Sequence, residues 1–321
     1  MKDRFGREID YMRLSVTDRC NLRCKYCMPP EGIKKVDMSM ILSNEEIAAV
    51  CEAALSLGIN KFKITGGEPL VRYNVVDLVA RIKALPGTLQ VTMTTNGQEM
   101  ARYIDILCDA GIDAFNISLD TLRADRYAEI TRVGDLQKTL DAIDMSISRG
   151  IRTKLNCLVQ RGFNEDEIIE LSEFALNKGI DIRFIELMPI GIADARNGYS
   201  SMETMARLRE AYPALEEDES EHGNGPAVYY KLPGRQGAIG IISSVHGKFC
   251  ESCNRVRLTS MGYIKPCLCY DETVFIRPYI AEGKETLAEA LREAILGKPA
   301  HHCFEYDGSE VDHHSMSEIG G

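Results

Sequence analysis

Three cysteines lie close together near the start of the chain, in the stretch SVTDRCNLRCKYCMPP (15–30): Cys20, Cys24 and Cys27. Their C-x3-C-x2-C spacing places three soft thiolate ligands in one loop, and thiolates select zinc, copper(I) or iron-sulfur clusters. A structural zinc site uses four ligands, usually from paired C-x2-C units, so zinc here would need a distant fourth residue. Three thiols instead suit a 4Fe-4S cluster that keeps one iron open. The loop therefore predicts a metal centre with a free coordination position.

A second set of three cysteines lies in HGKFCESCNRVRLTSMGYIKPCLC (246–269): Cys250, Cys253 and Cys267. The C-x2-C pair is common in zinc ribbons, so zinc is an alternative here. A ribbon would use a second pair, however, and Cys269 suits this poorly because only one residue separates it from Cys267. Directly after the pair, Arg255 and Arg257 alternate on one face of an expected strand. Because guanidinium groups bind phosphate in a bidentate way, an open metal position beside two arginines indicates a nucleotide pocket.

The overall composition is that of a globular protein, with 45% hydrophobic and 27% charged residues. The net charge of -10 argues against a nucleic-acid or membrane-surface binder, because such partners require a broad positive field. An anionic ligand must then be held by a local cluster of basic residues. We see neither a signal peptide nor a run of about 18 apolar residues, and we expect a cytoplasmic location. The cysteines outside the two sets are expected to pack as small hydrophobes: Cys51, Cys108, Cys157, Cys269 and Cys303.

Short apolar runs alternate with segments of helical period over the first 190 residues. We expect strands at 12–16, 61–65, 91–95, 114–119, 153–159 and 182–188, and helices at 43–58, 74–85, 98–110, 135–149 and 164–178. Ser43 and Glu46 suit a capping box, and Gly58 a helix C-cap. The motifs TGGEP, TTNG, SLD and ELMP each follow a strand, on the face where parallel barrels assemble their sites. The pattern predicts an α/β fold, an incomplete parallel (β/α)6 barrel, with a doubly wound open sheet as the alternative.

The pattern changes after Pro189. We place a domain boundary near residue 190, with the partial barrel at 1–190 and a C-terminal extension at 191–321 that carries the second cysteine set. In this extension we expect one short helix within 194–213, an acidic turn-rich loop at 216–226 and short strands within 227–245.

The first cysteine motif, with Tyr26 before its third cysteine, resembles the signature of radical S-adenosylmethionine enzymes. In that family the methionine end of the cosubstrate chelates the open iron of a 4Fe-4S cluster, and reduction yields a 5'-deoxyadenosyl radical that abstracts hydrogen. TGGEP (65–69) resembles the element that meets the cosubstrate's amino group. The resemblance implies that S-adenosylmethionine is bound by Tyr26, Gly67, Glu68, Ser118 and Met188. Without the resemblance, we would interpret the glycine pair as a tight turn, Ser118 as the solvated end of a strand and Met188 as a core residue.

Motifs over nearly the whole chain narrow this resemblance to the GTP 3',8-cyclase family of molybdenum-cofactor biosynthesis: YMRLSVTDRCNLRCKYCMP, ITGGEPLVR, TMTTNG, NISLDTL, KLNCLVQRGFNEDEI, RFIELMPIG, CESCNRVRLTSMGYIKPCL and MSEIGG. The resemblance implies a second 4Fe-4S cluster whose open iron takes the guanine edge. It implies GTP contacts from Arg13, Lys63, Thr94, Lys154, Arg255 and Arg257, with Lys61 and Arg183 as further candidates. It also implies that the terminal Gly320 and Gly321 enter the active site and act there with the two arginines.

In the implied reaction the radical removes the ribose 3' hydrogen and C3' attacks C8 of the base. One electron and one proton then complete 3',8-cyclo-7,8-dihydro-GTP, the first step of the pathway. The resemblance further implies an electron donor, a downstream cyclic pyranopterin monophosphate synthase and a homodimer as a candidate assembly. Lys63 departs from the family, which typically has arginine there, and offers a point charge instead of a fork. Four tail histidines could bind metal, although on an exposed tail such clusters are more often incidental: His301, His302, His313 and His314.

Two other functions are compatible with the residues. A radical peptide- or protein-modifying maturase could carry an auxiliary cluster, but such enzymes usually have a longer cysteine array in the extension. A non-catalytic iron-sulfur or zinc protein is the second alternative, and electron carriers saturate their clusters with four thiolates.

Overall fold

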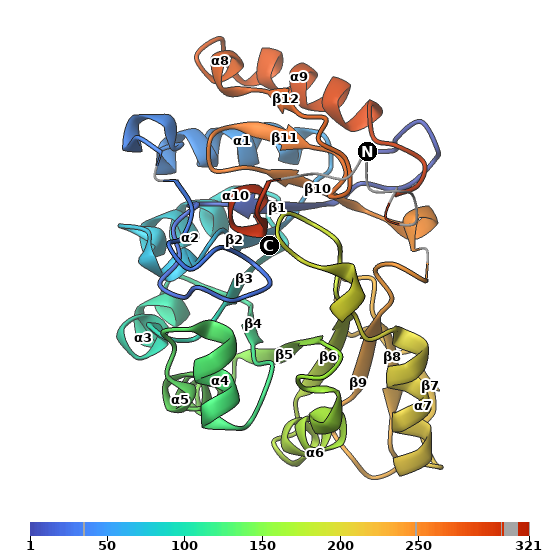
Figure 1. Cartoon of the computed structure of the whole chain (residues 1–321). Helices are drawn as coiled ribbons and strands as arrows, with labels where there is room; N and C mark the ends of the chain where they lie inside the picture. Colours follow the sequence, from blue (N-terminus) through green and yellow to red (C-terminus); the bar gives the residue numbers. More distant parts are fainter. Residues whose placement is uncertain (35, 248, 303, 305–313, 321) are drawn as a thin grey trace.

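The computed structural model describes residues 1–34, 36–247, 249–302, 304 and 314–320, and residue 195 by its backbone alone. The strands form one sheet in the order β12-β11-β10-β1-β2-β3-β4-β5-β6-β9-β8-β7. Its centre is six parallel strands in chain order: β1 (Tyr11–Ser15), β2 (Lys61–Thr65), β3 (Gln90–Thr95), β4 (Ala114–Ser118), β5 (Arg152–Val159) and β6 (Asp181–Glu186). Helices lie outside these strands (Figure 1), which confirms the predicted α/β fold with a partial parallel barrel.

Each pair of central strands is joined through a helix, as predicted: α1 (Asn44–Ser56), α2 (Val75–Ala84), α3 (Met100–Asp109), α5 (Leu136–Ser148) and α6 (Ile168–Asn177). Ser43 and Glu46 form the predicted capping box, and Gly58 follows α1 with a φ of +82°. An eight-residue helix, α4 (Ala124–Thr131), was not predicted; its N-cap is Arg123, which gives no capping signal. Short 3-10 helices complete the connections: η1 (Met38–Met40), η2 (Pro69–Val71), η3 (Glu165–Glu167), η4 (Ala195–Asn197) and η5 (Cys250–Ser252).

The C-terminal extension adds strands to both edges of this sheet. β9 (Ile239–Ile242) pairs in parallel with β6, and β10 (Arg255–Leu258) pairs in parallel with β1. Antiparallel partners continue each edge: β8 (Val228–Lys231), β7 (Glu216–Asp218), β11 (Tyr263–Lys265) and β12 (Val274–Phe275). β7 lies in the segment predicted as a loop, so that prediction is wrong for its first three residues. The remaining helices are α7 (Ser201–Ala211), α8 (Arg277–Ile280), α9 (Lys284–Leu296) and α10 (Met316–Ile319).

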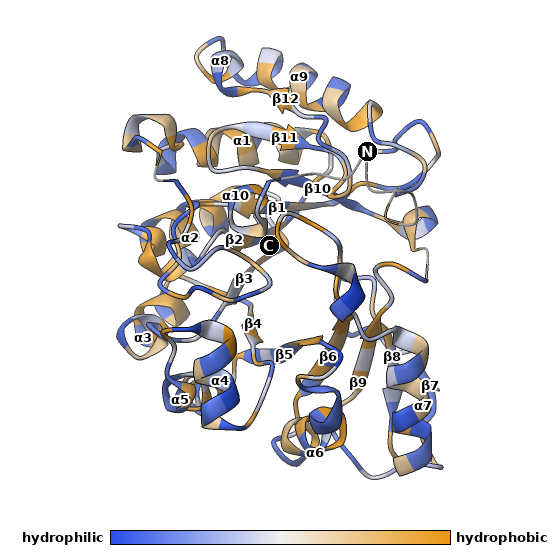
Figure 2. Cartoon of the chain, viewed as in Figure 1, coloured by the Kyte–Doolittle hydropathy of each residue, from blue (hydrophilic) through white to orange (hydrophobic). Residues whose placement is uncertain are grey.

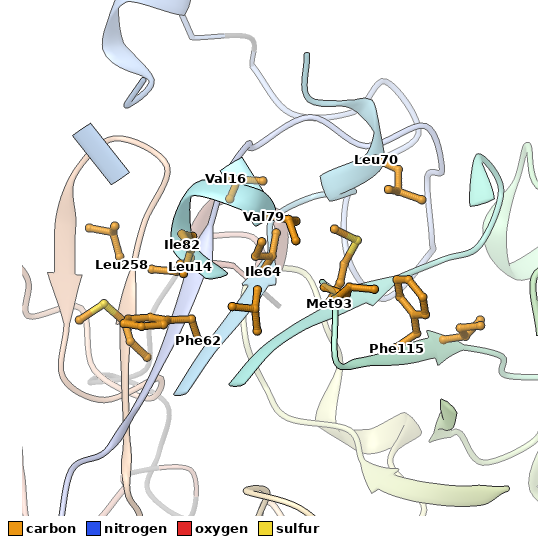
Figure 3. Close-up of a cluster of buried hydrophobic side chains, with 14 of the residues drawn as sticks. Leu14, Val16, Phe62, Ile64, Leu70, Val79, Ile82, Met93, Phe115 and Leu258 are labelled. Carbon is orange, nitrogen blue, oxygen red and sulfur yellow. The ribbon is translucent and has the colours of Figure 1, made fainter. Parts of the chain in front are cut away.

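The two faces of the central strands differ in chemistry. Phe62 and Ile64 of β2 are fully buried among the side chains between sheet and helices (Figure 3). The helices are amphipathic, with hydrophilic residues beside hydrophobic ones (Figure 2). The alternate residues of β2 face the other side, where Lys63 is buried too. Parallel strands are usually apolar on both faces, so a buried lysine on the inner face indicates a site rather than a core.

Candidate functional site

The N-terminal cysteines lie in the loop after β1, and all three line a cavity of about 210 Å³. Burial above all raises the pKa of Cys20 to about 12, of Cys27 to about 11 and of Cys24 well above its ordinary value. The charge of Cys27 adds to the rise for both Cys20 and Cys24. The three thiols therefore lie within electrostatic reach of one another, and as thiolates they require a compensating positive charge.

The glycine pair packs against the segment that enters this cysteine loop. A Cβ atom on Gly67 would lie 2.3 Å from the carbonyl oxygen of Arg19, and one on Gly66 would lie 2.5 Å from that of Thr17. The Gly67 N–H donates to the Thr17 carbonyl at 2.7 Å. Because no larger residue fits, this close approach fixes the loop after β2 against residues 17–19, directly before Cys20.

Glu68 stabilises the same loop through hydrogen bonds to its carboxylate. Its carboxylate accepts from the Leu70 N–H at 3.1 Å, the Thr95 hydroxyl at 2.7 Å and the Asn96 N–H at 2.8 Å. Burial raises the pKa of Glu68 to about 7. Of the residues implied to bind S-adenosylmethionine, all five line the smaller cavity, but the Glu68 side chain is largely committed to tying β2 to β3.

A second cavity of about 340 Å³ adjoins the first and fills the inside of the barrel. Seven residues line both cavities and form what we call the shared wall: Tyr26, Thr94, Ser118, Asp120, Leu158, Met188 and Met316. In this wall the Tyr26 hydroxyl donates to Asp120 at 2.7 Å, and the Leu158 N–H donates to the same carboxylate at 2.8 Å. Asp120 was not predicted from the sequence. Its place in the SLD motif after β4 was the available signal.

All six residues implied to contact GTP line the larger cavity, together with Arg183. The register explains how they meet, since Arg13 lies beside Lys63 across β1 and β2, and beside Arg257 across β1 and β10. Thr94 and Lys154 both neighbour Asn116 of β4. Strands far apart in the chain thus bring cations to one inner face of a protein whose net charge is -10.

Burial and the repulsion between neighbouring positive charges disfavour the charged form of several of these side chains. Burial, and then the charges of Arg183 and Arg13, lower the pKa of Lys63 well below its ordinary value. Burial and neighbouring arginines likewise lower the pKa of Arg257. Within the described part of the chain, no carboxylate forms an ion pair with Lys63 or Arg183, and Arg183 Nε makes no hydrogen bond. Since uncompensated buried charge is costly, this cavity suits an anion.

Lys154 and Lys61 differ from Lys63 because each forms an ion pair with a carboxylate. Lys154 Nζ lies 2.7 Å from Asp181 and 3.0 Å from the Tyr229 hydroxyl, and burial lowers its pKa to about 8. Lys61, named from the sequence as a further candidate, does not line the cavity; its ammonium pairs with Asp10 at 2.7 Å.

The second cysteine set lines the larger cavity at its β10 side. Burial, and then Cys267 and Cys253, raise the pKa of Cys250. Although burial opposes it, Arg255 lowers the pKa of Cys253 to about 7. Lys298 is buried nearby and donates to the carbonyls of Arg255 and Pro266 at 2.9 and 2.6 Å. These thiols thus converge beside the cations, as the nucleotide-pocket prediction requires.

The C-terminal tail reaches this site through helix α10. The Gly320 carbonyl accepts from Arg257 Nη1 at 2.5 Å, and a Cβ atom on Gly320 would lie 2.7 Å from Ser15 Cβ. With a φ of +82°, only glycine suits this position. Gly321 lies outside the described residues. Upstream in the tail, His302 is buried while His301 and His314 are exposed, and His313 lies outside the described residues.

The five remaining cysteines behave differently. Cys51 and Cys157 are buried, as expected for packing thiols, and Cys108 is half-buried. Cys269 is buried beside Ile190 and Ile319, but it is disulfide-bonded, so the prediction of a simple packing thiol is wrong for it. Cys303 lies outside the described residues.

The donor sets fit iron-sulfur clusters. Each cavity presents three converging thiols, which is the set a cubane needs when one iron stays open. Among the described residues no three cysteine, histidine or carboxylate side chains lie close enough to hold a single metal ion. Thiolates of a cubane bind separate irons and need not meet at one point.

Among the described residues, the helices are too short or too polar to cross a bilayer.

Comparison with known proteins agrees with this geometry. The Radical SAM superfamily model matches residues 14–175, and the Molybdenum Cofactor Synthesis C model matches residues 180–304. The chain is 44% identical to the GTP 3',8-cyclase of Alkaliphilus oremlandii over all of both chains. It is 43% identical to that of Listeria monocytogenes serotype 4b, covering all of this chain and 99% of the relative.

Among solved structures, Streptococcus suis SuiB bound to S-adenosylmethionine superposes with a TM-score of 0.68. The match covers 97% of this chain and 78% of SuiB at 14% identity, so it supports the fold alone.

Proposed function

The chain belongs to the GTP 3',8-cyclase family of the radical S-adenosylmethionine superfamily and cyclises GTP in the first step of molybdenum-cofactor biosynthesis, and we propose that its two adjoining cavities divide this reaction. The smaller cavity holds a 4Fe-4S cluster on Cys20, Cys24 and Cys27, with S-adenosylmethionine. The larger cavity holds GTP and a second 4Fe-4S cluster on Cys250, Cys253 and Cys267. The shared wall is the observation that carries this proposal, because a radical formed on one side must reach the substrate on the other.

When bound, the reduced first cluster and S-adenosylmethionine supply a deoxyadenosyl radical. The protein's own part is to hold the ribose of GTP at the shared wall and to keep water away. Ser118 and Met188 line that wall at the carboxyl ends of β4 and β6, where both ligands can touch them. Gly67 lines the cosubstrate side, where the close packing of its loop leaves the backbone exposed to the ligand.

Charge selects the substrate class. Arg13, Lys63, Lys154, Arg255 and Arg257 would bind the triphosphate, with Thr94 at the ribose side. A bound triphosphate would neutralise these buried positive charges and so offset the free-energy cost of burying them. Gly320 holds Arg257 through its carbonyl oxygen, so the tail would orient a catalytic arginine. We assign Gly321 to the same catalytic group.

Several finer assignments belong to this proposal. A separate electron donor supplies the reducing electrons, and cyclic pyranopterin monophosphate synthase takes the product. The protein works in the cytoplasm, with a homodimer as its candidate assembly. The division of the chain near residue 190 also remains a prediction.

The deciding experiment is an anaerobic assay with both clusters reconstituted, dithionite, S-adenosylmethionine and either GTP or ATP. We expect 5'-deoxyadenosine and a GTP-derived cyclised product only with GTP, measured by mass spectrometry. Deoxyadenosine formed equally with both nucleotides would contradict the guanine preference and redirect the substrate search to peptides. No cleavage by protein with both clusters intact would contradict the radical assignment.

A further inference from the structure

The segment after helix α9 holds parts of the second cysteine set together. The buried face of α9 fixes where the chain leaves the helix. Lys298 follows, only 3% exposed, and its ammonium donates to the carbonyls of Arg255 at 2.9 Å and Pro266 at 2.6 Å. Pro266 directly precedes Cys267. Arg255 follows Cys253 by two residues, so one ammonium joins the two stretches that carry these cysteines.

A second buried cation holds the remaining cysteine of this set. Arg7 is buried, and its guanidinium donates to the Cys250 carbonyl at 3.0 Å. The same guanidinium donates to the carbonyls of Pro299 at 2.7 Å and Ala300 at 3.0 Å. Arg7 Nε also lies 2.6 Å from Asp3, so this positive charge is balanced locally. Arg7 thus connects the N-terminal segment, the second cysteine set and the segment after α9.

The charge of Lys298 is not balanced in this way. Among the described residues, no carboxylate forms an ion pair with Lys298 or Arg255. Both charges act on the Cys253 sulfur, and Arg255 Nη2 lies 3.8 Å from it. The reduction potential of an iron-sulfur cluster depends on nearby charge and on burial. Uncompensated buried cations beside these thiols therefore favour the reduced form of a cluster that they hold.

The first cysteine set has the opposite surroundings. Within the described residues, the smaller cavity is lined by the carboxylates of Glu68 and Asp120 and by no lysine or arginine, whereas eight such cations line the larger cavity. Glu68 and Asp120 are both buried, so water and salt screen their charges weakly. The charge of Glu68 acts on the Cys20 sulfur, and that of Asp120 on the Cys24 sulfur. An additional electron on a cluster in this loop is therefore repelled.

Resting on the proposed function for the presence of two clusters, we infer that Lys298 and Arg7 are positioning residues of the second cluster and that Lys298 makes this cluster the more easily reduced of the two. Each cubane takes one electron from the external donor, and no bond forms or breaks in this step. The cluster beside GTP is then reduced before the cluster that binds S-adenosylmethionine.

An anaerobic redox titration followed by electron paramagnetic resonance tests this order on the full chain carrying both clusters. The titration is run without nucleotide at pH 8, above the pKa of about 7 for Glu68 and about 6 for Asp120. The signal that S-adenosylmethionine alters identifies the first cluster, and the signal that GTP alters identifies the second. Where the second cluster is half reduced, we expect about a tenth or less of the first to be reduced, a separation of about 59 mV or more. Coinciding midpoints or the reverse order would overturn the inference.

Lys298→Met tests the source of the difference. It removes the charge and should lower the midpoint of the second cluster by about 59 mV, a tenfold change in its reduced fraction, while the first changes by less than about threefold. Lys298→Arg keeps the charge and should keep the order. Lys284→Met is the matched control at the start of α9, because Lys284 is 51% exposed and pairs with Glu52 at 3.0 Å; both midpoints should stay unchanged. An unchanged second midpoint in Lys298→Met with its iron retained would contradict the role of Lys298.

Two further variants keep the inference testable if Lys298→Met loses the second cluster. Asp120→Asn removes a buried negative charge at constant size and should raise the midpoint of the first cluster alone; no rise would contradict the charge argument. Arg7→Lys cannot reach three carbonyls and should alter the spectrum of the second cluster but not of the first. An unchanged spectrum would contradict the role of Arg7.

Iron content separates this inference from the proposed function. Reconstituted wild-type protein with only about four irons per chain, all in the first cluster, would overturn both. Two clusters with the reverse order of reduction would reject only the inference about Lys298.

Discussion

Replacing Lys63 by methionine should change stability and substrate binding in opposite directions. Lys63 is 9% exposed, and the groups that shift its pKa are all cations, with no acid among them. In GTP-free protein it must either bury a charge beside Arg13 and Arg183 or give up its proton. Deprotonating an ordinary lysine at pH 7 costs about 5 kcal/mol, which is an upper limit to the penalty.

Methionine has a similar length and no charge. Replacing buried ions by hydrophobic residues of similar volume commonly stabilises a protein by about 1 to 4 kcal/mol. For a chain of this length, we expect Lys63→Met to raise the melting temperature of the GTP-free protein by roughly 2 to 6 °C. The loss of a charged phosphate contact costs about 1.5 to 3 kcal/mol, so the dissociation constant for GTP should rise by about 10- to 100-fold.

Lys61→Met is the matched control, two residues earlier on the same strand. Lys61 pairs with Asp10 at 2.7 Å, with both side chains 25% exposed, and it does not line the cavity. Losing such a partly exposed pair costs about 1 kcal/mol or less, and GTP affinity should stay within about twofold. Anaerobic calorimetry with and without GTP measures both quantities. If Lys63→Met destabilises the GTP-free protein and leaves GTP binding unchanged, Lys63 is structural and our account of the cavity is wrong.

Three further predictions test other parts of the site. The pKa of Lys154 lies at about 8 in GTP-free protein, below the ordinary 10.5, so stability should rise with pH between these values, while GTP binding must take up a proton above pH 8. The apparent GTP affinity should therefore fall by up to about tenfold per pH unit above 8, and Lys154→Met should remove this dependence in a titration series. Glu68→Gln replaces an acceptor of three hydrogen bonds by a group that also donates, and it should destabilise the protein by about 2 kcal/mol in denaturant unfolding, although its size is unchanged. Arg257→Ala should weaken GTP binding by about 10-fold or more while the iron content stays at eight per chain for two cubanes; loss of iron would make this arginine a structural support of the second cluster.

Local patterns were sufficient to predict the parallel strands and their motifs. In β2, the short apolar run KFKIT predicted a strand, and TGGEP marked its carboxyl end. Each of these signals lies within a few residues of the chain. The helix α4 escaped because it is short and begins without a capping side chain.

Register between distant strands could not be predicted in the same way. β10 begins 240 residues after β1 ends, yet it pairs with β1 so that Arg257 adjoins Arg13. The different roles of Lys61 and Lys63 could not be predicted from the sequence either, because both lysines lie on the same face of β2. Only the structure shows that Lys61 pairs with Asp10 whereas Lys63 lines the cavity. Residues 222–226, which line the larger cavity, follow a run of acidic residues that gave no hint of an inward-facing surface.

The distribution of charge connects these observations. An acidic protein repels a polyphosphate at long range, so affinity for GTP must come from contacts inside the cavity. The alternation of side chains along each β-strand places arginine and lysine on the inner face and apolar side chains on the outer face. The apolar outer face stabilises the fold, whereas the buried cations of the inner face destabilise it. Such a cluster of buried cations destabilises the empty protein, and a bound triphosphate removes this penalty. The affinity for GTP and the instability of the empty site therefore have the same origin, the buried cations. A substitution that stabilises the empty protein by removing one of these cations must also weaken GTP binding.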